Sequence, residues 1–217
     1  MLGRAQIVAG AVLGVAAIGL FQLAASSPTA LGQQAAAPDP LVTQGHVSVE
    51  GREVAYTIRH LPVSSYPELP AAVAAELETR GCLIPQTYEA HRPENVIHGS
   101  LERAGTTDWA VLCSVGGRVQ LLVFFASGAV ASPAVLAEHM EIDRLQSRNT
   151  GEADAAGTMG FNWGIDPASP AVVHQAQLAM AHRPATPDHD AVADSIIDHR
   201  TVYHLFRNGA WERLKVE

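Results

Sequence analysis

The chain has 217 residues, of which 14 are Lys or Arg and 22 are Asp or Glu, so its formal net charge at pH 7 is −8. Nucleic-acid binding requires a basic surface that displaces counterions from phosphates, and this acidic chain contains no run of Lys and Arg. We therefore predict no nucleic-acid partner. The residues that follow an N-terminal targeting segment suit one domain with its own hydrophobic core.

The N-terminus predicts export from the cytoplasm. Arg4 precedes an apolar run from Ile7 to Phe21, and small residues follow, among them Ala35 to Ala37. This order is typical of a secretory signal peptide. The alternative is an uncleaved membrane anchor, because Ala5 to Ala25 is just long enough to span a bilayer. Only through such a retained segment do we expect contact with a membrane.

We assign residues 1–32 to the signal peptide or anchor, residues 33–43 to a linker and residues 44–217 to a single domain. Both alternatives place this domain outside the cytoplasm, either in the periplasm or secreted. In that oxidising environment Cys82 and Cys113, which are the only cysteines, are expected to form a disulfide. The bridge would contribute about 3 kcal/mol to stability. Two buried free thiols are the alternative.

Two elements are predicted at the start of the domain. The first is a hairpin that turns at Glu50-Gly51, because apolar residues alternate with polar ones on both arms (Val47, Val49, Val54, Tyr56 and Ile58). The second is a helix from Leu69 to Arg80, in which apolar residues recur every four positions and which Gly81 can cap.

A three-stranded meander is predicted in the middle of the chain. Its strands are Val96 to Glu102, Trp109 to Ser114 and Arg118 to Phe125, and the turns between them contain Ala104-Gly105 and Gly116-Gly117. Apolar side chains of the third strand point to both faces, so we expect a central strand that is covered on both sides.

The remaining elements follow from cap and turn signals. In chain order we predict a short helix (Ala134 to Met140), a polar edge strand (Glu141 to Ser147), a flexible loop (Asn149 to Gly160), a short strand (Phe161 to Trp163) and a helix capped by Ser169 (Ala171 to Ala181). The chain ends in a hairpin that turns at Asn208-Gly209 and places Phe206 opposite Trp211. Together these elements predict an α+β fold, with an antiparallel sheet of about six strands and two main helices packed on it.

The sequence lacks the motifs of several enzyme classes. It contains no G-x-S-x-G elbow, no P-loop and no dinucleotide fingerprint. Asp108, which precedes the middle strand of the meander, is expected to accept turn hydrogen bonds. The leading hypothesis is therefore a non-enzymatic exported domain that binds an unknown protein or small molecule, with no catalytic residue and no cofactor assigned. A membrane-tethered accessory domain is the alternative if the leader is retained.

Histidines and aspartates gather near the C-terminus. Imidazole and carboxylate groups suit zinc, and if one ion is bound we expect the ligands to be His182, His189, Asp190 and His199. A metal-dependent hydrolase is the function that this cluster would support. Its spacing matches no closed zinc motif, so the alternative is a polar loop with a helix cap at Asp188 or Asp190.

Four segments carry a resemblance that extends over most of the domain: GCLIPQ (Gly81 to Gln86), NVIHG (Asn95 to Gly99), DWAVLCS (Asp108 to Ser114) and HLFRNGAW (His204 to Trp211). Together they resemble a group of uncharacterised bacterial exported proteins, and this resemblance implies export but no activity. Locally, Gly99 to Val111 is similar to a degenerate FG-GAP or VCBS unit. That unit binds calcium through an acidic loop, but Ser100, Leu101 and Arg103 stand at ligand positions here, so calcium binding does not carry over.

Overall fold

A computed structural model describes residues 41–147, 158–178, 180, 183, 185–196 and 200–216. The contacts within the chain divide it into two units, Met1–Ala37 and Pro38–Glu217, and the fold below is that of the second unit. The predicted signal segment lies outside the described residues. In the part of the chain that the structure describes, no helix is both long and apolar enough to cross a membrane.

The larger of two sheets has nine strands and contains most of the chain before residue 162. Seven strands follow the order β7-β6-β5-β3-β2-β9-β8, while β1 pairs with β2 and β4 pairs with β5. Their bounds are β1 Val42–Val49, β2 Arg52–Pro62, β3 Leu83–Gln86, β4 Val96–Gly99, β5 Asp108–Val115, β6 Arg118–Phe124, β7 Ala134–Met140, β8 Leu145–Ser147 and β9 Thr158–Phe161. The sheet is mixed, because β9 runs parallel to β2.

The smaller sheet is antiparallel and has four strands in the order β10-β11-β12-β13. Their bounds are β10 Gly164–Ala168, β11 Ala191–Ile196, β12 Arg200–Arg207 and β13 Ala210–Val216. The helical elements among the described residues are α1 Ala71–Arg80, α2 Pro170–Gln177 and two 3-10 turns, η1 Val63–Ser65 and η2 Glu141–Arg144.

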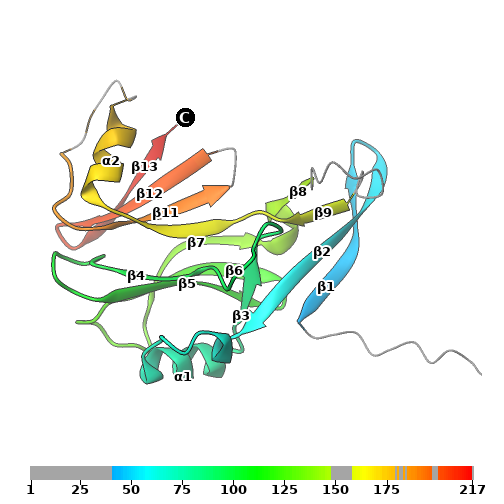
Figure 1. Cartoon of the computed structure of the whole chain (residues 1–217), viewed down its shortest axis with the longest axis horizontal. Helices are drawn as coiled ribbons and strands as arrows, with labels where there is room; N and C mark the ends of the chain where they lie inside the picture. Colours follow the sequence, from blue (N-terminus) through cyan, green and yellow to red (C-terminus); the bar gives the residue numbers. More distant parts are fainter. Residues whose placement is uncertain are drawn as a thin grey trace, which may run out of the picture. The chain divides into compact units, whose positions relative to one another are not determined.

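Three hydrophobic clusters separate four layers: helix α1, the large sheet, the small sheet and helix α2 (Figure 1). Alternate residues of one strand enter different clusters. Val111 of β5 packs with Leu77 of α1, whereas Leu112 of the same strand packs with Val192 of the small sheet. The small sheet's other face is covered by α2, whose Val173 is fully buried. Each sheet therefore has two apolar faces.

This architecture corrects the predicted fold class. The chain is mostly β, with sheets of nine and four strands instead of one antiparallel sheet of about six. Each helix covers a different sheet. The smaller sheet was missed because β10 and β11 are short and lie within stretches rich in Gly, Pro, Asp and Ala, which give weak strand signals.

Several local predictions are confirmed. The hairpins that turn at Glu50-Gly51, Gly116-Gly117 and Asn208-Gly209 all form, and both central residues of each turn have positive φ, as the preferred two-residue hairpin turn requires. The predicted central strand, β6, lies between β5 and β7 and is buried on both faces. Helix α1 ends at Gly81, whose φ is +74°.

Other local predictions are wrong. Ala134–Met140 is strand β7 instead of a helix, because pairing with β6 outweighs the helix propensity of its Ala, Leu and Glu residues. Glu141–Arg144 forms η2, and only Leu145–Ser147 of the predicted edge strand is extended. The turn at Gly105 is a longer loop than a hairpin turn, since β4 already ends at Gly99. Helix α2 ends at Gln177, before the predicted Ala181.

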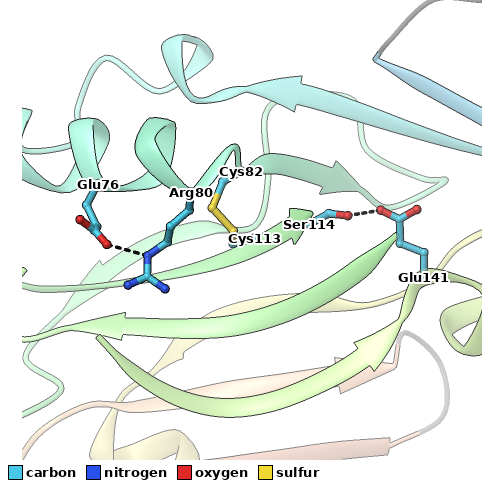
Figure 2. The surroundings of a disulfide bond; sticks show 6 residues. All are labelled: Glu76, Arg80, Cys82, Cys113, Ser114 and Glu141. Atoms are coloured by element: carbon cyan, nitrogen blue, oxygen red, sulfur yellow. Dashed lines mark hydrogen bonds and ion pairs between the residues drawn. A yellow bond between two sulfur atoms is a disulfide. The ribbon is translucent and has the colours of Figure 1, made fainter. Parts of the chain in front are cut away.

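Cys82 and Cys113 form the expected disulfide, with their Cα atoms 5.0 Å apart. Cys82 follows the cap of α1 and Cys113 lies in the middle of β5, so the bridge ties the helix to the large sheet (Figure 2). Both cysteines are buried in the cluster between α1 and that sheet. The free thiol alternative is thereby set aside.

Candidate functional site

A cleft lies where β7 of the large sheet faces β11, β12 and β13 of the small sheet. Its volume is about 290 Å³, and ten of the described residues line it: Ala137, His139, Arg144, Asp194, Ile196, Arg200, Thr201, Val202, Arg213 and Lys215. Four of these residues are Arg or Lys and only one is acidic. In a chain with a net charge of −8, this is a local reversal of sign.

The register of the small sheet explains how side chains from three strands reach one cleft. Asp194 of β11 lies opposite Val202 of β12, which in turn lies opposite Lys215 of β13. Arg213 is two residues before Lys215, so the two cations project from the same face of β13. On the large sheet, Ala137 and His139 are likewise two residues apart on β7.

Arg144 is held at the cleft by aromatic packing. Its guanidinium carbon lies 4.7 Å from the centroid of the Trp163 ring, a distance at which a cation and an aromatic face attract each other. The ring of His139 meets the same indole edge-on, with centroids 5.2 Å apart. The Nε of Arg144 is buried and has no hydrogen-bond partner among the described residues. Trp163 itself is fully buried, so the ring on which Arg144 packs is held in place.

Asp194 does not neutralise the cations directly, because its two oxygens are engaged elsewhere. Oδ1 accepts a hydrogen bond of 2.6 Å from Nε1 of Trp163, and Oδ2 lies 3.1 Å from Nε2 of His204. Both partners are buried. Across the residues that the structure describes, no carboxylate lies within ion-pair distance of Arg144, Arg200, Arg213 or Lys215.

Burial is the largest influence on the pKa values of Arg144 and His139 in the cleft. Burial lowers the pKa of Arg144, and the neighbouring Arg200 lowers it further, against the opposing fields of Asp194 and Asp143. Burial likewise lowers the pKa of His139, with the positive charge of Arg144 as the next cause. His139 is therefore neutral at pH 7, and the guanidinium and ammonium groups of the cleft have no ion-pair partner among the described residues.

A second group of polar side chains, the buried network of His60, Ser114 and Glu141, lies at the start of η2. Nε2 of His60 is 2.7 Å from Oε1 of Glu141. The hydroxyl of Ser114 donates to the same oxygen (Figure 2). All three residues are at most 4% exposed. Serine hydrolases need the hydroxyl to donate to histidine, whereas here it donates to the carboxylate. This arrangement serves stability.

The pKa of Glu141 reflects its hydrogen bonds in this buried network. Burial alone would raise this pKa, but the hydrogen bonds from His60 and Ser114, together with the charge of His60, hold it below its usual value. The ionised carboxylate is thus the form that the fold prefers.

The predicted metal ligands are only partly described. His182 and His199 lie outside the described residues, so the four-residue zinc site stays a prediction. Both ring nitrogens of His189 already lie near protein oxygens, Nδ1 2.7 Å from Oδ1 of Asp188 and Nε2 2.8 Å from the carbonyl oxygen of Phe206. Asp190 accepts a hydrogen bond from the backbone N–H of Ser100. No three potential ligands gather at one point among the described residues.

Asp190 also lines a shallow polar pocket of about 430 Å³ at the end of the meander, with His98, Gly99, Ser100, Thr106, Thr107, Pro167 and Ser169. Nearby, Asp108 is fully buried and performs the turn role predicted for it. Its carboxylate accepts hydrogen bonds from the backbone N–H groups of Leu101, Glu102 and Ala126 and from the hydroxyl of Thr106. The helix cap suggested for Asp188 or Asp190 is wrong, because strand β11 follows.

Sequence reasoning missed the cleft itself. Arg213 and Lys215 alternate on the predicted C-terminal hairpin, and this signal could have placed two cations on one face. No sequence pattern brings Arg144 to Trp163, which is 19 positions away in the printed sequence. Comparison of the chain with models of protein families, with curated proteins and with solved structures finds no match.

Proposed function

We propose that the protein is an exported binding domain that holds a small anionic ligand non-covalently in the cleft between its two sheets. The observation that carries this proposal is the set of four cations that line the cleft without an ion-pair partner among the described residues. Arg144 is partly buried, and a partly desolvated cation costs free energy in the absence of a counter-charge. A bound anion would supply that counter-charge.

The fixed position of Arg144 also favours binding. Arg144 rests on Trp163, and Asp194 fixes the indole by accepting a hydrogen bond of 2.6 Å from its ring N–H. A guanidinium that is ordered before the ligand arrives loses less conformational entropy on binding. Ala137, Ile196 and Val202 add apolar contact area beside the charges.

Export is part of the proposal. The Cys82–Cys113 disulfide is compatible with an extracytoplasmic location, since such bonds persist in oxidising compartments. The finer assignment to the periplasm or the medium rests on the N-terminal sequence pattern. An intact-mass measurement of the exported protein tests it, because retention of residues 1–32 would indicate a tethered accessory domain instead.

Tryptophan fluorescence provides the binding test, because Trp163 lies beneath Arg144. Sulfate, inorganic phosphate, citrate and acetate are titrated at constant ionic strength into the wild type, Arg144→Gln and Arg80→Gln. Arg80 is the matched control: it is also an arginine, but it lies on α1, where it pairs with Glu76 (Figure 2). We expect saturable binding of at least one anion by the wild type and by Arg80→Gln, with weaker binding by Arg144→Gln.

Two results would contradict the proposal. One is the absence of saturable binding for every anion. The other is binding that Arg144→Gln and Arg80→Gln weaken equally, since this would indicate a response to net charge. A panel of esterase, phosphatase and peptidase substrates, assayed with and without chelator, tests the metal-dependent hydrolase hypothesis separately. Chelator-sensitive turnover would replace a binding function with a catalytic one.

A further inference from the structure

We infer that the ligand of the cleft is a multiply charged oxyanion, carrying two or three negative charges, and that a monoanion is not a matching ligand. This inference rests on the proposed function, because it names the class of ligand that the same cleft would take. It follows from the number of charges in the cleft, the geometry of the groups that carry them and the size of the space.

The number of charged side chains in the cleft predicts the charge of the ligand. Among the described residues that line the cleft, four are cations (Arg144, Arg200, Arg213 and Lys215) and one is a carboxylate, that of Asp194, so their net charge is three positive charges. Asp143 lines an adjoining hollow that shares Arg144 and Arg200 with the cleft, and counting it reduces the surplus to two. A single negative charge would leave at least one cation uncompensated, whereas a dianion or trianion would balance the site.

The chemistry of the donors selects oxyanions. Three of the four cations are arginines, whose planar guanidinium groups donate two parallel hydrogen bonds to carboxylate, phosphate or sulfate. Arg144 lines the cleft and has no carboxylate partner among the described residues, so its guanidinium can donate to an oxyanion bound there. A spherical monoanion such as chloride cannot use this paired geometry.

The position of the cations excludes a long polymeric ligand as the primary match. Arg144 lies on the buried Trp163, at the junction of η2 with β8, and the cleft volume of about 290 Å³ suits a small molecule. The other three cations are exposed on β12 and β13. A ligand that engages Arg144 and also reaches these outer residues needs several anionic oxygens spread over one compact body, as in a phosphate monoester or a tricarboxylate.

Isothermal titration of the full exported protein at pH 7.5 tests the valence. The probes are acetate, sulfate, inorganic phosphate and citrate, each at the same ionic strength, with the wild type, Arg144→Gln and the control Arg80→Gln. We expect at least one multivalent probe to bind at least about tenfold more tightly than acetate, because each added charge-assisted hydrogen bond contributes about that factor. Arg144→Gln should lose most of this preference, and Arg80→Gln should keep it.

The two proposals can fail separately. Equal affinities for acetate and every multivalent probe, with weakening by Arg144→Gln, would overturn the multivalent ligand and leave anion binding in the cleft intact. No binding of any probe would overturn both. The four probes also distinguish two classes of multivalent ligand. A preference for sulfate and phosphate indicates a tetrahedral group, and a preference for citrate indicates clustered carboxylates.

Discussion

The two ends of η2 carry charged side chains of opposite sign in opposite circumstances. At the first residue, the carboxylate of Glu141 enters a buried network in which His60 and Ser114 both contact the same oxygen. At the last residue, the guanidinium of Arg144 lies on Trp163 without a carboxylate partner among the described residues. A single turn of four residues thus presents one internally matched charge and one unmatched charge.

The difference indicates what each charge contributes. A buried charge that has its partners supports the native state, and removing one partner leaves the others unsatisfied. A partly desolvated charge without a partner adds little stability in the absence of ligand, and its free energy is recovered when an anion binds. Substitutions at the two ends of η2 should therefore separate stability from binding.

The largest effect is expected for Glu141→Ala. This change removes the acceptor shared by His60 and Ser114 in an environment that is almost fully closed to water, so we expect a loss of about 3 kcal/mol in the free energy of unfolding. Urea denaturation followed by circular dichroism measures it. Glu141→Gln, which keeps one acceptor oxygen and nearly the same volume, should lose clearly less. Equal losses from the two variants would show that the negative charge of the carboxylate, and neither its volume nor a single acceptor oxygen, provides the stability.

Arg144→Gln should have the reverse profile. We expect anion affinity to fall by at least about tenfold, since a charge-assisted donor is lost. The free energy of unfolding without ligand should change by less than about 1 kcal/mol, because relief from the burial and from the charge of Arg200 offsets the lost contact with Trp163. Thermal melts with and without ligand give both quantities. A large loss of stability without ligand would show that the residue is structural.

The sequence alone could not predict most of the difference between the two ends of η2, and the reason is physical. Hairpin signals are local, so Asn208-Gly209 gives the register that places Arg213 opposite His204 and Lys215 opposite Val202, and half of the cleft follows from it. The other half depends on the packing of two sheets. Strand β7 carries His139 but has the composition of a helix, and η2, which positions both Glu141 and Arg144, lies where an extended strand was predicted.

The same limit applies to the prediction of the fold. The alternation in β6 predicted two covered faces, and both are covered. It could not show that one cover is a second sheet, since an apolar face has the same pattern whether a helix or a sheet packs on it. The disulfide was predictable because two cysteines in an exported chain allow only one intramolecular pair.

Acid should affect the matched end of η2 before a general loss of structure. The pKa of Glu141 in the folded protein lies below its usual value, which is near 4.5, so the folded state binds fewer protons than the unfolded state in the range below that value. The stability contributed by the carboxylate is therefore complete above about pH 4.5 and is lost as the pH falls through the lowered pKa. Urea titrations between pH 6 and pH 3 should show the difference between wild type and Glu141→Gln narrowing below pH 4.5. A difference that stays constant would contradict the role of the ionised form.

The smallest effect concerns His139, at the unmatched end. The groups that face it are Asp143 and Arg144 of η2, Asp194 of β11, Arg200 of β12, and Arg213 and Lys215 of β13. Burial and the charge of Arg144 lower the pKa of His139 from its usual value near 6.5, so the free protein holds this ring neutral at pH 7. A bound anion favours the protonated ring, and proton uptake then accompanies binding.

Affinity should consequently rise as the pH falls from 7 towards 5, by at most about tenfold per pH unit for one coupled proton. Sulfate is the suitable probe because its charge does not change in this range. His139→Gln, which is neutral at every pH, should bind sulfate with a flat profile and with affinity similar to that of the wild type at pH 7.5. Because Gln cannot take up a proton, a slope that persists in this variant would assign the titration to another group and would leave His139 as a packing partner of Trp163.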